Sequence, residues 1–368
     1  MKKSIAMGLT CLILAGPAFA AKKDADEKPA VRSKRMVEVC GFLKFTAAAD
    51  TGVYPGNYAA WARSGFKDNQ YNSTAKESRL GLNFLKEGEE RQVSGKLEID
   101  FFGSASENKA NPMMRHAYLE IFCPKKNVSI LAGQTWDVIS PLNPMSNNYS
   151  VYWWAGNIGY RRPQLRFTKA GEKVTTQVAF TRTIGDIASS TAAYGSGEDG
   201  GFPTVQGRMA LSGPRATLGI WGHFGEEEYG EGNFVSSSAG ADLKIKMGEK
   251  AVLLSEAWMG KNLDAYLGGV GQGMNGSKEI HAQGGWAALI LGPFQGTKVY
   301  FGGGFDNPNN LDVKTGMRSC NSAGWGGVSV DVVSGTALGL EYSYLDTRYL
   351  NAPMGYSHRG QMTLTYGI

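Results

Sequence analysis

The sequence predicts an all-β fold, a transmembrane antiparallel β-barrel of about 16 strands. Three observations predict it. A short basic and apolar segment opens the chain, apolar and polar residues alternate through most of the remaining sequence, and the links between alternating segments are short and long in turn. Fifty glycines, 16 tyrosines, 16 phenylalanines and 8 tryptophans fit a strand-rich chain with many turns and aromatic girdles.

The first twenty residues have the form of an export signal. Lys2 and Lys3 provide a basic start, Ile5 to Leu14 are mostly apolar, and Ala18-Phe19-Ala20 matches a signal-peptidase site. The apolar stretch is short for a membrane-spanning helix, which needs about 20 residues. We therefore expect a signal peptide over residues 1–20 that is cleaved during export.

A short charged segment comes next. Residues 21–36 carry nine charges and one proline, which is typical of a solvated periplasmic tail before a barrel over residues 37–368. Without the signal, lysine plus arginine fall from 38 to 36 against 33 acidic residues, a net charge of +3. A chain so nearly neutral gives no indication of nucleic-acid binding.

Period-two alternation begins at Val37. In Gln92–Phe101, apolar side chains at the odd positions alternate with Gln92, Ser94, Lys96, Glu98 and Asp100. The same pattern occurs in Arg79–Phe84, Val205–Leu211 and Ala241–Met247. Alternate residues of a strand point to opposite faces, whereas a helix would repeat near every third or fourth residue. These segments are therefore expected to be strands with one apolar and one polar face.

The connections indicate a membrane barrel. The short links are Lys86–Arg91, Pro124–Asn127, Gly171–Lys173, Gly213–Arg215, Gly248–Lys250, Gly292–Gly296 and Val333–Gly335. The long ones include Thr51–Lys76, Val138–Tyr160, Thr183–Thr204, Asp264–Glu279 and Asp306–Ser319. Outer-membrane barrels have short periplasmic turns and longer extracellular loops, an asymmetry for which a soluble sandwich has no reason.

The last residues support this assignment. Met362, Leu364, Tyr366 and Ile368 alternate with polar or small residues up to the carboxyl terminus. An amphipathic final strand is the kind of signal that outer-membrane assembly recognises, although Ile368 stands where Phe or Trp is usual.

A barrel of this size implies a pore. Every backbone polar group in lipid must be satisfied internally, so the sheet has to close. About 16 strands close around a space too wide for side chains to fill, which leaves water inside. The polar half of each strand then lines that water. We expect passive diffusion of ions and small hydrophilic solutes.

The third extracellular loop, residues 138–160, is expected to fold inward as the constriction. It is rich in aromatic residues, Tyr152 and Trp153 among them, and such a loop packs against a surface. The inner wall is the natural surface, and a subunit contact is the alternative.

Charged residues on the polar faces are candidates for the pore lining. They are Arg79, Lys96, Glu98, Asp100, Arg162, Arg166, Arg208 and Glu341. Arg162 and Arg166 directly follow the aromatic loop, so we expect both to point into the lumen near its narrowest level. Rings of arginine are typical of anion-selective pores. The three acidic residues make the lumen mixed, and we expect a preference for anions.

Several segments resemble the DcaP-like group of trimeric outer-membrane porins. They are Ser78-Arg79-Leu80-Gly81, Arg115-His116-Ala117-Tyr118, Ala132-Gly133-Gln134-Thr135-Trp136, Gly156–Pro163, Gly284-Gly285-Trp286-Ala287, Leu340-Glu341-Tyr342 and Thr347-Arg348-Tyr349. The resemblance spans residues 37–368. It implies a 16-stranded homotrimer in outer-membrane lipid, with an inward third loop and a preference for small anionic solutes such as dicarboxylates. Residues 21–36 are too few and too polar for the longer N-terminal coiled coil of the founding member.

Two other functions have less support. An outer-membrane barrel hydrolase would need a nucleophile beside a histidine, and His116, His223, His281 and His358 carry no such motif. A barrel serving as a structural surface protein would need a large additional domain. We expect no enzyme, cofactor or metal site, because no His/Cys cluster has ligand spacing.

Two further features are minor. Gly268–Gly276 resembles a phosphate loop but lacks its lysine and following helix, so we expect a flexible loop. Cys40, Cys123 and Cys320 remain after cleavage, and a bridge between Cys40 and Cys123 is open.

Overall fold

The structure is a computed structural model that describes residues 35–54, 58–88, 90–104, 109–184, 200–229 and 232–368. The expected signal peptide and nearly all of the charged tail lie outside these residues. The first strand begins at Arg35, two residues before the barrel boundary expected from the sequence.

Seventeen strand segments of the described chain form one antiparallel sheet. They are β1 (Arg35–Asp50), β2 (Gln70–Thr74), β3 (Arg79–Lys86), β4 (Gln92–Asp100), β5 (Met113–Cys123), β6 (Val128–Trp136), β7 (Arg161–Ala170), β8 (Val174–Thr181), β9 (Thr204–Ser212), β10 (Ala216–Tyr229), β11 (Gly232–Lys246), β12 (Ala251–Lys261), β15 (His281–Phe294), β16 (Thr297–Pro308), β17 (Arg318–Val333), β18 (Thr336–Tyr349) and β19 (Ala352–Gly367). A small hairpin, β13 (Met274–Asn275) with β14 (Lys278–Glu279), and a 3-10 turn, η1 (Asp264–Tyr266), lie between β12 and β15.

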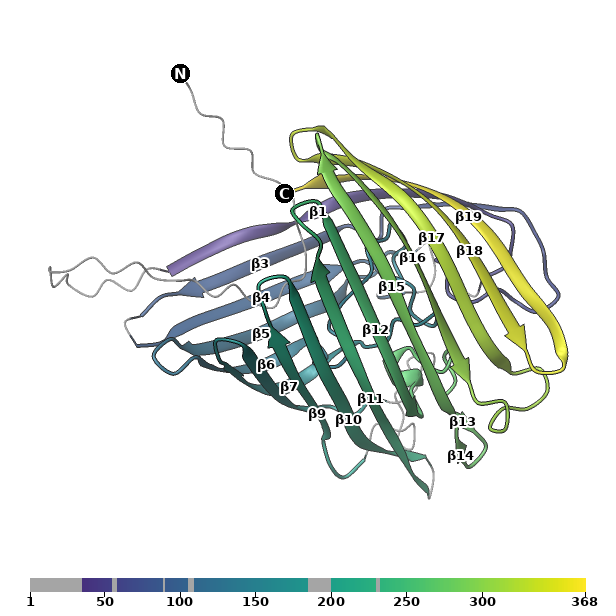
Figure 1. Ribbon diagram of the computed structural model, residues 1–368, viewed down its shortest axis with the longest axis horizontal. Coiled ribbons are helices and arrows are strands. Elements are labelled where there is room, and N and C mark those ends of the chain that lie inside the picture. Colours follow the sequence, from purple (N-terminus) through teal and green to yellow (C-terminus); the bar gives the residue numbers. More distant parts are fainter. Residues whose placement is uncertain (1–34, 55–57, 89, 105–108, 185–199, 230–231) are drawn as a thin grey trace, which may run out of the picture.

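The sheet closes on itself (Figure 1). On one side, β1 pairs with β19 from Phe42↔Gly367 to Asp50↔Arg359. On its other side it pairs first with β3 and then with β2, so these two segments are successive parts of one barrel strand. The 17 segments therefore make a barrel of 16 antiparallel strands, which confirms the predicted fold class.

The two faces of the wall have the polarity of a membrane barrel. On β4, the apolar Leu97 is 42% exposed while Glu98 and Asp100 are 6% and 0% exposed. β19 alternates strictly in the same way up to its end. Large apolar side chains point out of the barrel and charged ones point in, the reverse of a soluble protein. No helix in the described part of the chain is long and apolar enough to cross a membrane.

The expected asymmetry of the links is present, with two corrections. Every short turn predicted from the sequence lies at the end where β19 finishes, and the long loops lie at the opposite end. That opposite end also has two close strand connections, from β10 to β11 and from β18 to β19, which the sequence pattern did not reveal. The first long link is shorter than expected because β2 forms within it.

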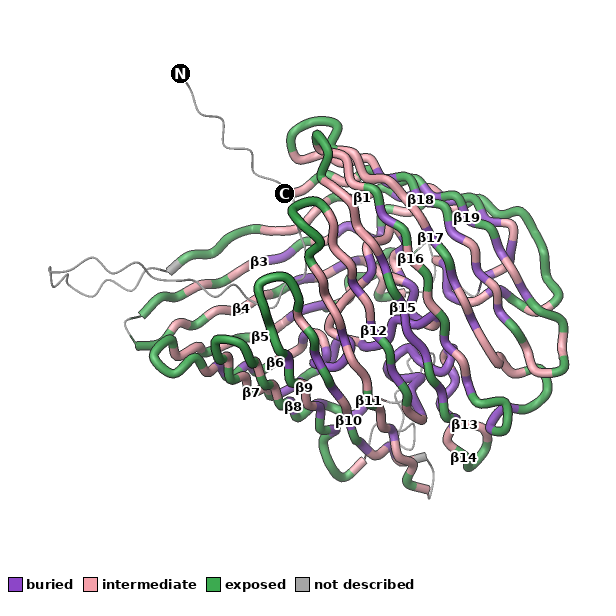
Figure 2. The backbone as a smooth tube through the Cα atoms, viewed as in Figure 1, coloured by how far each residue is buried: buried purple, intermediate pink, exposed green. Residues whose placement is uncertain are grey.

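Three long loops turn into the barrel. They are loop 1 (described over residues 51–54 and 58–69), loop 3 (residues 137–160) and loop 6 (residues 262–280), and buried positions gather inside the wall where they meet (Figure 2). The expectation of a flexible Gly268–Gly276 segment is wrong for the part around Val270. This residue is fully buried, and its N–H donates to the Asp306 carboxylate at 2.9 Å. The inward course of loop 3 is confirmed.

Candidate pore constriction

The two ends of loop 3, Asp137 and Tyr160, are bonded to each other between β6 and β7, and we call this base of the loop its root. The Asp137 N–H donates to the Tyr160 carbonyl at 2.9 Å, and the Tyr160 N–H donates to the Asp137 carboxylate at 3.0 Å. The same carboxylate pairs with Arg162 at 2.8 Å and accepts a bond from Gln206 at 2.8 Å. The two ends of the loop are therefore fixed to each other and to the wall.

The first half of loop 3 is attached to β12 through Glu256. This buried carboxylate accepts hydrogen bonds from the Ser140 hydroxyl, from the Leu142 N–H at 2.8 Å and from the Trp286 indole at 3.1 Å. Carboxylates form strong, charge-assisted bonds with such donors. Glu256 was not among the residues singled out from the sequence.

The middle of loop 3 is attached to β18 through Glu341. One carboxylate oxygen accepts bonds from Ser146 at 3.0 Å and Tyr152 at 2.8 Å, and the other from the Asn147 N–H at 2.6 Å and Tyr300 at 2.9 Å. Glu341 thus points inward, as its strand parity indicates, but it binds the loop and is 5% exposed. Tyr152 is buried with it and stacks on Trp325 at 4.0 Å between ring centroids.

Loops 1 and 6 support the returning half of loop 3. The Ser150 hydroxyl donates to the Ala59 carbonyl of loop 1 at 2.6 Å. The N–H groups of Trp154 and Gly159 donate to the carbonyls of Leu267 and Tyr266 of loop 6, at 3.0 and 2.8 Å. The three loops form one hydrogen-bonded unit inside the barrel. The three loops therefore fill part of the barrel interior.

A group of charged side chains lies on the barrel wall, on β3, β4 and β5. Arg115 pairs with Glu98 at 2.9 Å and with Asp100 at 2.6 Å. Glu98 also pairs with Lys96 at 2.7 Å and lies 3.9 Å from Arg79. The structure therefore brings together four of the sequence-predicted residues. Arg115, which connects them, was noted in the sequence only through the family resemblance.

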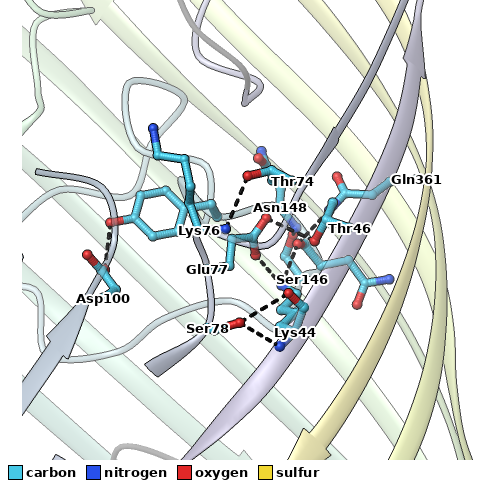
Figure 3. Close-up of polar contacts among 12 residues, drawn as sticks. Lys44, Thr46, Thr74, Lys76, Glu77, Ser78, Asp100, Ser146, Asn148 and Gln361 are labelled. Atoms are coloured by element: carbon cyan, nitrogen blue, oxygen red, sulfur yellow. Dashed lines mark hydrogen bonds and ion pairs between the residues drawn. The ribbon is translucent and has the colours of Figure 1, made fainter. Parts of the chain in front are cut away.

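Tyr149 joins this group to loop 3. Its hydroxyl donates to Asp100 at 3.0 Å, a contact drawn in Figure 3 beside the labelled Asp100, and its ring stacks on Phe102 at 3.9 Å. Burial raises the pKa of Tyr149, so the hydroxyl keeps its proton and remains a donor. Trp153 packs against Tyr149 and Trp136 on the same side.

Arg161 lies beside this group at the start of β7. Its guanidinium stacks on the rings of Trp136 at 4.7 Å and Tyr160 at 4.9 Å, and the residue is 2% exposed. Its Nε and Nη1 atoms have no hydrogen-bond partner, and none of the described carboxylates forms an ion pair with it. Buried guanidinium donors without partners are costly, so this position favours an anion.

The other three predicted arginines are paired or bonded to the protein. Arg162 is 1% exposed, pairs with Asp137 and lies over the Tyr266 ring at 4.0 Å. Arg166 donates to Gln164 at 2.9 Å and to the Trp136 carbonyl. Arg208 pairs with Asp242 through two bonds of 2.7 and 2.9 Å. Arg162 thus holds the loop root and does not present an uncompensated charge to the lumen.

The histidine and cysteine residues noted in the sequence lie apart from the charged group on β3, β4 and β5, with the exception of His116. His223 contacts the hydroxyls of Ser238 at 2.6 Å and Ser236 at 3.0 Å, but it is buried beneath the Tyr266 ring of loop 6. No group of three or more His, Cys, Asp or Glu side chains that could hold a metal ion occurs in the described ranges. No disulfide joins Cys40 and Cys123 there.

Comparison with known proteins defines the class of fold. No family model matches the chain, and no curated protein is significantly similar to it. Among solved structures, the outer membrane channel DcaP of Acinetobacter baumannii is similar with a TM-score of 0.77 and 16% identity, over 91% of this chain and 97% of that one. An anion-selective porin from Comamonas acidovorans gives 0.63 and 13%, over 91% and 100%. The trimer form of OmpT, an outer membrane protein of Vibrio cholerae, gives 0.58 and 10%, over 91% and 99%.

At these identities the likeness establishes the fold. The chain is a 16-stranded barrel of the porin type. The resemblance to DcaP-like porins found in the sequence is confirmed for the fold, with the DcaP channel itself among the similar structures.

Proposed function

We propose that the chain forms a water-filled pore in an outer membrane and lets small hydrophilic solutes pass by diffusion, with a preference for anions such as small carboxylates. The closed barrel with an inward loop 3 supports the pore. Similarity to an outer membrane channel and to an anion-selective porin supports the same function.

The charge balance at the constriction carries the anion preference. Arg79, Lys96, Arg115 and Arg161 supply four positive charges against the two of Glu98 and Asp100, an excess of two. Arg161 has no acidic partner in the described structure. Guanidinium remains charged at any working pH and binds carboxylates in a bidentate manner. The excess charge therefore attracts anions and repels cations at the narrowest level.

Reversal potential in a planar bilayer, across a potassium chloride gradient, tests this proposal. We expect anion selectivity for the wild type and a clear shift toward zero for Arg161→Gln, because the excess falls from two charges to one. Arg91→Gln, at an exposed turn before β4, is the matched control and should leave the potential unchanged. A cation-selective wild type, or an Arg161→Gln channel identical to it, would contradict the proposed preference.

The proposal also includes the location of the protein in the outer membrane. We propose export by a signal peptide over residues 1–20, with the barrel in outer-membrane lipid and a periplasmic tail. Leu97 points out of the wall, so Leu97→Arg should reduce the stability of the folded barrel in lipid by about 2–4 kcal/mol. Ser94→Arg points inward, opposite Glu120, and should be nearly neutral. Equal damage from both, measured by urea unfolding in vesicles, would contradict this orientation.

We also propose a homotrimer. The trimer form of a structurally similar protein and the family resemblance support it. Mass analysis in mild detergent should give three copies, and a monomer would count against it. The two rival functions have separate tests. Ester or peptide hydrolysis by the folded protein would favour a barrel hydrolase. A folded barrel that gives no conductance would favour a structural surface protein.

A further inference from the structure

Loop 6 begins with two oxygen-bearing residues in alternate positions, Asn262 and Asp264. Their side chains are buried, at 0% and 9% exposed. They come shortly before the glycine-rich segment Gly268–Gly276, and they lie apart from the charged group on β3, β4 and β5. Acidic and amide residues in alternate positions of a loop are the arrangement that supplies oxygen ligands to Ca²⁺ in EF-hand loops. Their side-chain oxygens therefore have the chemistry of ligands for a hard cation.

The two side-chain oxygens converge on one point, above the Cα atom of Gly273. A Cβ atom at Gly273 would lie 2.2 Å from Asn262 Oδ1 and 2.2 Å from Asp264 Oδ1, so these oxygens are at most twice that distance apart. Two ligands of one calcium ion, each at about 2.3–2.6 Å, can be up to about 5 Å apart. Because Gly273 has no side chain to separate them, both oxygens can reach a single ion.

Backbone hydrogen bonds hold this arrangement in place. The Asn262 N–H donates to the Ile280 carbonyl at 3.0 Å, and the Ile280 N–H donates to the Gly273 carbonyl at 2.8 Å. The Leu267 N–H donates to the Asp264 carbonyl at 2.9 Å and closes the 3-10 turn η1. The loop itself therefore positions the two oxygens.

The Asn262 amide gives independent evidence of a ligand. Its nitrogen donates to the Glu227 carboxylate at 2.9 Å, which fixes the orientation of the amide. Its oxygen is buried and accepts no hydrogen bond within the described residues. A buried acceptor without a donor is costly, and a bound ion or water is the usual reason for one.

The surroundings favour a positive charge at this point. The Asn262 amide lies between the buried carboxylates of Glu227 and Asp264. The cation that contacts this part of loop 6 is Arg162, which donates to the Ala265 carbonyl at 3.1 Å but forms its ion pair with Asp137. A cation close to two buried carboxylates is electrostatically favourable.

We propose that Asn262 and Asp264, with the space above Gly273, form a calcium site that fixes loop 6. The Asp264 carboxylate and the Asn262 amide oxygen bind the ion, and Glu227 orients the amide. Backbone carbonyls and water complete the roughly six to eight oxygen ligands of calcium, whereas Mg²⁺ needs a tighter octahedral shell and fits less well. One ligand is an amide, so the site is distinct from a cluster of His, Cys, Asp or Glu side chains.

Terbium luminescence and thermal unfolding of the folded barrel in detergent test the site. Tb³⁺ replaces Ca²⁺ on oxygen ligands and emits when a nearby tyrosine or tryptophan is excited. For the wild type we expect Tb³⁺ emission that Ca²⁺ displaces, with a dissociation constant of roughly 10⁻⁴–10⁻³ M, the range of extracellular calcium modules. The midpoint of thermal unfolding should be a few degrees higher in millimolar Ca²⁺ than in EDTA.

Two variants remove the site by independent routes. Asp264→Asn takes away the charged ligand and should weaken calcium binding by about tenfold or more. Gly273→Ala places a methyl group between the two oxygens without changing any charge. Both should abolish the difference between Ca²⁺ and EDTA. Glu279→Gln is the matched control, because it removes one charge from the same loop, where Glu279 pairs with Lys261 at 3.3 Å, and it should respond like the wild type.

Folding of each variant is checked by its heat-dependent migration in gels. A wild-type protein with equal unfolding midpoints in Ca²⁺ and EDTA, or without Tb³⁺ emission that Ca²⁺ displaces, would overturn the site. So would a folded Asp264→Asn or Gly273→Ala variant that responds to Ca²⁺ as the wild type does. A response lost in Glu279→Gln as well would assign the ion to the surface of the loop and also overturn the proposal. If one variant fails to fold, the other variant and the wild-type titration decide.

Discussion

The two sides of the barrel interior hold loop 3 by different chemistry. At the root, a buried cation meets a buried anion, Arg162 with Asp137. On β12 and β18, Glu256 and Glu341 accept bonds from hydroxyl, indole and backbone donors. None of the described cations forms an ion pair with either carboxylate. The proposed anion preference therefore depends on which charges are paired, because Arg162 is neutralised by Asp137 while its neighbour Arg161 has no acidic partner in the described structure.

The largest effect is expected at the root. Asp137→Ala leaves Arg162 buried without its partner, which should destabilise the barrel by about 3–5 kcal/mol. Replacing both residues by leucine removes the unpaired charge, and most of that loss should be recovered. Urea unfolding of the barrel in detergent, followed by gel migration, measures both. Equal losses in the single and double variants would show that packing, and not charge pairing, dominates at the root.

A smaller loss of stability is expected where loop 3 is bonded to Glu341 on β18. Glu341→Gln keeps the shape but places an N–H group against one pair of donors, at a cost of about 1–3 kcal/mol. Some of these donors are hydroxyls that can turn to accept, which limits the loss. Glu120→Gln is the control, since Glu120 is only half-buried. A loss for Glu341→Gln larger than that for Asp137→Ala would break the distinction between the two sides.

The smallest loss of stability is expected at Asp312, in the link between β16 and β17. Burial would raise the pKa of Asp312, but Lys278 at 2.6 Å and His281 at 2.9 Å lower it to about 2. The contacts of the Asp312 carboxylate with Lys278 and His281 therefore stabilise the fold above about pH 4, and this stabilisation is lost as the pH falls toward 2. Asp312→Asn should cost about 0.2–1 kcal/mol at neutral pH and nothing in strong acid. A pH-independent difference between the two proteins would show that the contact is not electrostatic.

The barrel could be predicted from the sequence because period two is a local property. Each strand needs only its own residues to show which side chains face lipid, and Leu97 beside Glu98 is such a case. Glu341 was expected to face inward for the same reason. Its bonds to Ser146, Asn147 and Tyr152 were not, since nothing local shows which part of the wall a loop will reach.

At Arg161, the alternation of inward and outward positions along the strand predicts the wrong environment for the side chain. Pro163 and Leu165 are exposed on the outer face of β7, so alternation assigns the odd-numbered Arg161 to that face as well. At this point β7 pairs with β6 but not yet with β8, and both Arg161 and Arg162 are buried. The aromatic neighbours Trp136 and Tyr160, on which Arg161 stacks, were the available signal. Glu256 had no distinguishing signal, because an inward acidic residue on a strand is common in such barrels.

The pairing of β1 with β19 has a consequence for how the barrel is made. It joins residues 309 to 325 positions apart, from Asp50 with Arg359 to Phe42 with Gly367. The other strand neighbours come from nearby parts of the chain and can zip together in sequence. Contacts between distant residues cost the most chain entropy and form slowly, so this seam is expected to close last. Until it does, the protein is an open sheet with two free edges, and the pairing of β1 with β19 is the step that seals it.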